Sequence, residues 1–146
     1  KSVREHSRGC KLAAEAIIDV ECDIWIPAAR PDVIREDNVA RLKTKLVIEG
    51  ANIPFTPGAE KILHEKGVLC VPDFIANAGG VICAAIEYGG ATQSAAFAAI
   101  EEKLRANTEA VLARSKREGV MPRAAAMALA TERVRRAMAL RRWGLY

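Results

Sequence analysis

Three short apolar runs in the first half of the chain constrain the fold more than any other feature. They occupy residues 22–27, 45–50 and 68–72, and each ends in proline or glycine. Crowded β-branched, aromatic and other apolar residues favour strands, and a proline or glycine interrupts the hydrogen-bonding ladder. Apolar runs without alternation are typical of strands buried on both faces, as in a parallel sheet. The runs therefore predict a buried sheet of about three strands.

The segments between these runs carry helical signals. Thr56 is a favoured N-cap, Pro57 suits the first helical turn, and Gly67 is placed to end the helix. A shorter helical segment is predicted over residues 37–42, and residues 3–20 fit a helix or a helix followed by a loop. Strands that alternate with helices predict an α/β fold with parallel strands and right-handed crossover helices.

From residue 78 onward the pattern is helical. Apolar residues recur at helical spacing over residues 78–88, 93–116 and 123–141, which predicts two or three long C-terminal helices. With 146 residues the chain is within the usual size of one domain. We therefore expect a single domain, with a β/α part over residues 1–88 and a helical tail over residues 89–146.

Composition and charge narrow the classes of protein further. Hydrophobic residues make up 51% of the chain and charged residues 27%, as in globular proteins. The longest charge-free stretches have 13 residues, short of the ~20 that a membrane-spanning helix needs, so we expect no membrane partner. The net charge of +4 arises in residues 101–146, which hold 11 basic and 5 acidic groups. Interspersed glutamates there favour a solvated helix face over nucleic-acid binding.

The four cysteines argue for a reduced protein without a metal site. Cys10, Cys22, Cys70 and Cys83 form no C-x-x-C pair, and only two histidines accompany them. This spacing does not match a zinc site. Two of the cysteines lie in apolar runs, where a free cysteine behaves as a small buried hydrophobe. We expect a cytoplasmic protein, because disulfides are rare in that compartment.

Asparagines and glycines follow the predicted strands where ligands bind in parallel sheets, beyond the carboxyl ends. Asn52 follows the second run, Asn77 follows the third, and Gly79 and Gly80 come next. A carboxamide donates and accepts hydrogen bonds at once, and glycines let a flat ring approach the backbone. Two such amides suit the hydroxyls and carboxamide of a nicotinamide nucleoside. Asparagine also caps turns and helices, so both interpretations stay open.

The remaining polar candidates give no catalytic assignment. Asp73 and Glu49 fit either a catalytic base or a helix cap and dipole partner. His64 lies in a charged helix end, which is typical of a surface residue. The sequence has no G-x-G-x-x-G, no P-loop and no nucleophile elbow. The phosphate-binding half of a dinucleotide site is therefore missing from these residues.

Four segments, taken in order, resemble the later half of the Glu/Leu/Phe/Val amino-acid dehydrogenase family, with glutamate dehydrogenase foremost. The segments are C-D-I-W-I-P-A-A (22–29), K-L-V-I-E-G-A-N-I-P-F-T-P-G-A (45–59), G-V-L-C-V-P-D-F-I-A-N-A-G-G-V (67–81) and R-A-A-A-M-A-L-A-T-E-R-V-R-R-A-M (123–138). Their spacing is similar to the family's over about residues 20–143. The resemblance implies the C-terminal half of an NAD(P)-binding, Rossmann-like domain whose glycine-rich turn would precede Lys1.

The resemblance also implies a reaction and a set of site residues. Family members deaminate an L-amino acid such as glutamate oxidatively to a 2-oxo acid and ammonia, with NAD or NADP as cofactor. The positions that match cofactor-binding residues are Ala28, Ala29, Asn52, Asn77, Gly79 and Gly80. The positions that match the amino-acid pocket are Asn77, Val81 and Ala84. Glutamate-specific members have serine at the last position, and alanine cannot donate a hydrogen bond to a side-chain carboxylate, which puts glutamate specificity in doubt.

The family's catalytic lysine and aspartate would lie in a separate substrate domain outside these residues. Because the chain begins with lysine and its first methionine is Met121, we expect a piece of a longer polypeptide that is inactive by itself. The resemblance further implies that the parent is a homo-oligomer. A competing hypothesis is a non-catalytic module whose basic C-terminal helices bind a partner or nucleic acid. Binding to nucleic acid should weaken steeply as the salt concentration rises, whereas nicotinamide recognition by Asn52 and Asn77 should hardly respond.

Overall fold

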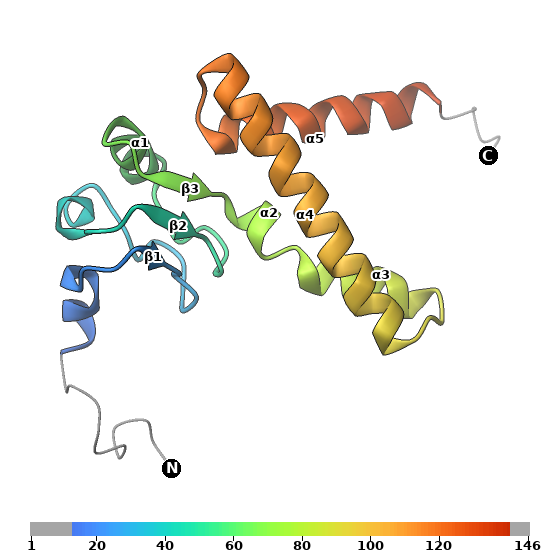
Figure 1. Ribbon diagram of the computed structural model, residues 1–146, viewed down its shortest axis with the longest axis horizontal. Coiled ribbons are helices and arrows are strands. Elements are labelled where there is room, and N and C mark those ends of the chain that lie inside the picture. The colour runs from blue at the N-terminus through green and yellow to red at the C-terminus, as the bar shows by residue number, and fades with distance from the viewer. Residues whose placement is uncertain (1–12, 141–146) are drawn as a thin grey trace, which may run out of the picture.

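Three parallel strands form the predicted sheet (Figure 1). The computed structural model describes residues 13–140. Strand β1 (Ile24–Trp25) pairs with β2 (Leu46–Ile48), and β2 pairs with β3 (Leu69–Val71), both in parallel. The order β1-β2-β3 follows the chain. The predicted α/β class, with about three parallel strands, is confirmed.

The first strand is shorter and more exposed than predicted. Only Ile24 and Trp25 of the apolar run 22–27 are extended and paired, and Pro27 has no N–H to continue the ladder. Among the described residues β1 has one neighbour, β2, so it is the edge of the sheet. Ile24 is 52% exposed. The prediction of strands buried on both faces is therefore wrong for β1 within the described structure.

The helix between β2 and β3 forms as predicted. Helix α1 (Pro57–Glu65) begins after Thr56, whose Oγ1 accepts a hydrogen bond from the N–H of Ala59 at 3.4 Å. The backbone leaves the helix through Lys66 and Gly67, and Gly67 has φ +78°. Glycine adopts this left-handed conformation without steric cost. The cap, the first-turn proline and the terminal glycine are thus the local causes of α1.

The connection between β1 and β2 contains no α-helix, contrary to the predicted helical segment 37–42. It holds a single 3-10 turn, η3 (Val39–Arg41). The side chain of Asn38 accepts a hydrogen bond from the N–H of Arg35 at 2.8 Å and donates to the carbonyl of Val33 at 3.0 Å. Such bonds from an asparagine side chain to its neighbouring backbone stabilise a turn in place of a helix.

Another 3-10 helix, η2 (Ala14–Asp19), lies at the start of the described residues. It covers part of the helical segment predicted over residues 3–20. The rest of that prediction, at residues 3–12, lies outside the described residues.

Four helices follow the sheet: α2 (Asp73–Ala76), α3 (Gly79–Tyr88), α4 (Gln93–Glu118) and α5 (Pro122–Ala139). The last three confirm the predicted C-terminal helices, whereas the short α2 was not predicted. Gly119, with φ +65°, ends α4, and Pro122 begins α5, so the chain turns back on itself. None of the described helices is both long and apolar enough to cross a membrane.

Two clusters of buried side chains hold these elements together. The larger cluster joins the sheet to α1 and includes Val47, Leu63 and Cys70. The smaller cluster lies where α2, α4 and α5 meet, and includes Val111 and Ala125. The start of α5 therefore packs beside β3 and α2, as Figure 1 shows.

Truncation of the main core should destabilise the fold strongly. Leu63 is fully buried at 0% exposure, so Leu63→Ala should lower the free energy of unfolding by about 2–5 kcal/mol through lost burial and a cavity. Leu140 is 80% exposed, and Leu140→Ala is the matched control, with an expected change within about 0.5 kcal/mol. Urea unfolding of the complete protein measures both, and equal losses would contradict the assigned core.

Candidate functional site

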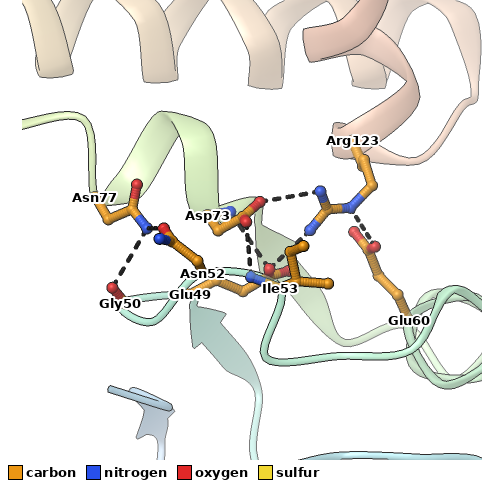
Figure 2. A network of polar contacts seen from close by, with 8 residues as sticks. All are labelled: Glu49, Gly50, Asn52, Ile53, Glu60, Asp73, Asn77 and Arg123. Atoms are coloured by element: carbon orange, nitrogen blue, oxygen red, sulfur yellow. Dashed lines mark hydrogen bonds and ion pairs between the residues drawn. The ribbon is translucent and has the colours of Figure 1, made fainter. Parts of the chain in front are cut away.

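Two asparagine side chains meet at the carboxyl edge of the sheet (Figure 2). Asn52 lies in the loop after β2, and Asn77 follows α2, just beyond β3. The Nδ2 of Asn77 donates to the Oδ1 of Asn52 at 2.7 Å and to the carbonyl of Gly50 at 3.4 Å. Among the described residues, the Nδ2 of Asn52 and the Oδ1 of Asn77 have no hydrogen-bond partner. A donor and an acceptor are therefore available beside one another. Asn77 is the C-cap residue of α2, where its backbone N–H bonds to the carbonyl of Asp73, while its side chain bonds outside that helix.

The end of β1 lies against the same loop. The N–H of Ala51 donates to the carbonyl of Pro27 at 2.7 Å. A Cβ built at Gly50 would lie 3.3 Å from the Cβ of Ala28, so glycine permits the close approach of the two loops. Ala28 and Ala29 are exposed beside this loop. The structure therefore brings Ala28 to the edge that carries the asparagines.

The loop that carries Asn52 contains a strained residue. Ile53 has φ +50°, a left-handed conformation that is rare for a β-branched residue. Its side chain is exposed, so burial does not compensate for the strain. Its N–H donates to the Oδ2 of Asp73 at 2.8 Å. Asp73 thus holds the loop from the first turn of α2.

Asp73 belongs to a buried cluster of three carboxylates around Arg123 (Figure 2). The guanidinium of Arg123 bonds through Nη2 to Glu49 at 2.7 Å, through Nε to Glu60 at 2.5 Å and through Nη1 to Asp73 at 3.0 Å. Glu49 also accepts a 3.3 Å bond from the N–H of Asp73. The three carboxylates come from the end of β2, from α1 and from the start of α2. One arginine on α5 therefore ties three elements together.

Burial and ionic contacts shift the pKa values of this cluster in different directions. Desolvation raises the pKa of Glu49 from 4.5 to about 7, although Arg123 opposes the shift. Desolvation would also raise the pKa of Asp73, but bonds from Ile53 and Arg123 outweigh it and hold that pKa below its ordinary value. The carboxylates outweigh desolvation at Arg123 and raise its pKa. Glu49 consequently gains and loses its proton near neutral pH.

The cluster contains the polar residues that sequence reasoning missed. Glu60 and Arg123 received no role, although Arg123 directly follows the helix-starting Pro122. Asp73 and Glu49, left open between a base and a structural role, are both buried in ionic contacts. Both oxygens of Asp73 accept hydrogen bonds, which favours the structural role. The local sequence shows no signal that would pair these residues.

The other predicted site residues lie on α3. Gly79 and Gly80 begin this helix, and Val81 and Ala84 are exposed one turn apart on it. A Cβ at Gly79 would make an ordinary contact with Ile100 at 3.5 Å, and a Cβ at Gly80 would meet no atom within 4 Å. Helix α3 packs against α4. The structure thus places these residues after Asn77, with open space over Gly80.

Two hollows lie elsewhere. One of about 510 Å³ lies at the amino ends of β1 and β2, among charged residues such as Asp23 and Lys45, opposite the asparagine pair. Another of about 190 Å³ lies between α2, α4 and α5. His64 is exposed at the end of α1. Within residues 13–140, no three acidic, histidine or cysteine side chains are grouped to hold a metal ion.

Several basic side chains of the tail are paired within the chain. Arg105 bonds to Glu101, and Arg114 bonds to Glu118 and Glu132. These ion pairs neutralise positive charge that a nucleic-acid-binding face would need to leave unpaired. The described contacts therefore favour a solvated helix face over the competing hypothesis of a basic interaction module.

The raised pKa of Glu49 predicts a specific dependence of stability on pH. Between about pH 4.5 and pH 7 the folded protein holds a proton that the unfolded chain releases. Stability from this residue is complete at acid pH and is lost as pH rises toward 7, by up to roughly 1.4 kcal/mol per pH unit.

Glu49→Gln should remove this part of the slope, because glutamine does not titrate. Urea unfolding of the complete protein at several pH values measures the difference. Glu65, which is exposed on α1, provides the control Glu65→Gln, which should keep the original slope. An unchanged slope in Glu49→Gln would contradict the assignment of the proton to Glu49.

Sequence comparisons find relatives along almost the whole chain. Glutamate dehydrogenase of Aeropyrum pernix is 43% identical over 97% of this chain and 36% of its own length. The NADP-specific glutamate dehydrogenase of Saccharolobus shibatae is 36% identical over 96% of this chain and 35% of its own length. The chain therefore spans about a third of the length of these curated relatives.

Solved structures show the same fold. The hetero-hexameric glutamate dehydrogenase of Thermus thermophilus matches with a TM-score of 0.82 at 30% identity, over 95% of this chain and 34% of that one. L-tryptophan dehydrogenase of Nostoc punctiforme matches with a TM-score of 0.77 at 25% identity, over 85% of this chain and 38% of that one. The sequence profile of one family covers residues 1–142. The chain belongs to the Glutamate/Leucine/Phenylalanine/Valine dehydrogenase family.

Proposed function

We propose that the complete protein containing this chain is an NAD- or NADP-dependent amino-acid dehydrogenase. In this proposal the chain forms the nicotinamide side of the cofactor site and part of the amino-acid pocket. The observation that carries the proposal is the Asn52–Asn77 pair, bonded at 2.7 Å at the carboxyl edge of a parallel sheet. Family membership over residues 1–142 supports the reaction class.

The chemistry of the pair fits a nicotinamide nucleoside. The free Nδ2 of Asn52 can donate to a ribose hydroxyl or carboxamide oxygen, and the free Oδ1 of Asn77 can accept from a hydroxyl or carboxamide N–H. Ala28 and Ala29 add small, exposed backbone at the same edge. Residues with short side chains leave room for a flat ring against the loops. We propose all four as cofactor-binding residues.

The two glycines of α3 support the same proposal. Glycine near the start of a helix weakens it relative to alanine. Neither Gly79 nor Gly80 has a positive φ, and a Cβ at either position would meet no clash in the described structure. Packing within the chain therefore does not require glycine there. Close approach of a ligand explains both residues, and we propose that they bind the cofactor.

The residues of this chain bind and orient, and we assign none of them a proton-transfer step. The bound dinucleotide would supply the hydride acceptor: the α-carbon of the amino acid would lose a hydride, and water would hydrolyse the resulting imine to a 2-oxo acid and ammonia. Asn77 would hold the cofactor and face the substrate. It lies just before Gly80, a proposed cofactor-binding residue, and Val81, a proposed residue of the amino-acid pocket. Asp73 is excluded as a base, since both its oxygens are engaged. The proton-transfer groups would lie in another part of the complete protein.

The amino-acid pocket has an apolar wall in this chain. Val81 and Ala84 lie on one face of α3 and are exposed. Neither side chain can bond to a carboxylate, so we propose that the substrate side chain is apolar at this point of contact. Asn77 completes the proposed pocket from the neighbouring turn.

We also propose the wider setting of the chain. Residues 1–146 would form the C-terminal half of a dinucleotide-binding domain, with a β/α part at 1–88 and a helical tail at 89–146. An oligomeric parent is supported by the hexameric relative. Free thiols at Cys22, Cys70 and Cys83 support a cytoplasmic location.

The proposed role of Gly80 predicts opposite effects on stability and binding. Gly80→Ala should stabilise α3 by up to about 1 kcal/mol, because alanine favours the helix and meets no neighbour. The added methyl should nonetheless weaken the binding of NADH or NADPH at least about tenfold, a loss of 1.4 kcal/mol. Urea unfolding and calorimetric titration of the complete protein measure the two effects. Unchanged affinity with raised stability would remove Gly80 from the cofactor site.

The apolar pocket predicts that one hydroxyl changes the substrate preference. Ala84→Ser should raise kcat/KM for glutamate relative to leucine by roughly 10- to 100-fold, as expected for a hydrogen bond to a charged group. Ala85→Ser, on the neighbouring face of α3, is the matched control and should leave the ratio unchanged. Steady-state reduction of NAD and NADP with both amino acids gives the ratios. The same ratio in all three proteins would contradict the placement of Ala84 in the pocket.

A further inference from the structure

We propose that Arg123, at the start of α5, is a positioning residue for the Asn52–Asn77 pair. It acts through Asp73 and Ile53 and touches neither asparagine itself (Figure 2). The inference rests on the proposed function, because it concerns how the cofactor-binding amides are held. It assigns a role in ligand binding to a helix that contributes no group to the proposed site.

The first step is the placement of the Asp73 side chain. Arg123 has three bonding nitrogens, and each faces the carboxylate of a different element. Glu49 and Glu60, which are almost wholly buried, fix two of these nitrogens. The third, Nη1, is thereby aimed at the Oδ1 of Asp73 at 3.0 Å. A planar guanidinium with its other nitrogens fixed restricts the orientation of the carboxylate that it meets.

The second step is the hold that Asp73 has on the loop. Once Oδ1 faces Arg123, the Oδ2 of Asp73 accepts the N–H of Ile53 at 2.8 Å. Ile53 has φ +50°, a left-handed conformation that is strained for a β-branched residue. Its side chain is 59% exposed, so the hydrophobic core does not offset this strain. The carbonyl of Ile53 also accepts a 2.9 Å hydrogen bond from the N–H of Asp32, and the bond to Asp73 is the side-chain contact that holds the N–H of Ile53.

The third step connects the loop to the asparagines. Ile53 joins Asn52 to the buried Pro54, so the backbone angles of Ile53 set how Asn52 is oriented relative to the packed chain that follows. The Oδ1 of Asn52 accepts the 2.7 Å bond from Asn77, which also reaches back to the carbonyl of Gly50. Relaxation at Ile53 would turn Asn52 away from Asn77 and separate the free donor from the free acceptor.

The bonds of Arg123 divide into two groups, which allows a controlled test. The bonds to Asp73 and Glu49 lead to the loop that carries Asn52, whereas the bond to Glu60 leads only to α1. Asp73→Asn keeps the size of the side chain but offers one acceptor where two are needed, for Arg123 and for Ile53. Arg123→Lys offers a single nitrogen to three carboxylates. Glu60→Gln removes a charge from the cluster but keeps an oxygen that can accept the bond from the Nε of Arg123, so the guanidinium keeps its orientation and this variant is the matched control.

The readout is the Kd of the complete protein for NADH and for NADPH, measured at a temperature where every variant is folded. We expect Asp73→Asn and Arg123→Lys each to raise Kd about three- to tenfold, the effect of misplacing one hydrogen bond. Glu60→Gln should lower the midpoint of urea unfolding and leave Kd unchanged. If Asp73→Asn and Arg123→Lys lower stability with unchanged Kd, Arg123 is only a structural link and the inference fails.

A double-mutant cycle between Asp73→Asn and Asn52→Ala separates the inference from the proposed function. If Asp73 acts through Asn52, the two changes together should raise Kd no more than Asn52→Ala alone. Additive effects would overturn the inference. If Asn52→Ala alone leaves Kd unchanged, the proposed cofactor site is wrong instead.

Hydrogen exchange gives a measurement that is independent of ligand. In Asp73→Asn the amide of Ile53 should exchange about tenfold faster or more, because its acceptor is displaced. The same amide should be unaffected in Glu60→Gln. Unchanged protection in Asp73→Asn would show that another contact holds the loop, and would overturn the inference.

Discussion

One guanidinium faces three buried carboxylates, and most of the described structure depends on that balance of charge. With all groups ionised, the side chains of Glu49, Glu60, Asp73 and Arg123 carry a net charge of −2 away from water. Desolvation penalises such a cluster, and the structure relieves the penalty by raising the pKa of Glu49 to about 7. One proton thus allows the remaining charges to stay buried in mutual contact.

The cluster matters more for arrangement than for net stability. Buried ion pairs are often replaceable by apolar residues at no loss, yet removal of one partner costs about 3–5 kcal/mol because a bare charge remains. Only one docking of α5 lets Arg123 reach the end of β2, α1 and the start of α2 together. A shifted tail would leave carboxylates unpaired. The charges therefore select one position of the helical tail on the sheet, where apolar contacts such as those of Val111 would tolerate small shifts.

Predictions from sequence succeed here where the causes are local. The cap at Thr56 and the stop at Gly67 lie next to the helix that they define. That Asn52 and Asn77 lie at the same edge of the sheet could be predicted because strand ends can be read from short runs. The hydrogen bonds of the Asn38 side chain to nearby backbone favour a turn over a helix, and helix propensity alone does not predict which of the two forms. Arg123 meets Asp73 across 50 residues and Glu49 across 74. No pattern in one sequence reports such a pairing, because it exists only after the tail has folded back.

Two exceptions to local rules lie at the edge of the sheet that carries the asparagines. Ile53 takes a backbone conformation that suits glycine, while Gly80 stands in a helix where alanine would be more stable. Each choice lowers stability, and neither is required by the apolar core. Natural sequences break local rules mainly where function demands it. The two exceptions flank Asn77. Ile53 lies in the loop that carries Asn52, the partner of Asn77, and Gly80 lies in the helix that follows Asn77. A ligand that contacts both Asn52 and the backbone of Gly80 accounts for the two exceptions together, whereas packing accounts for neither.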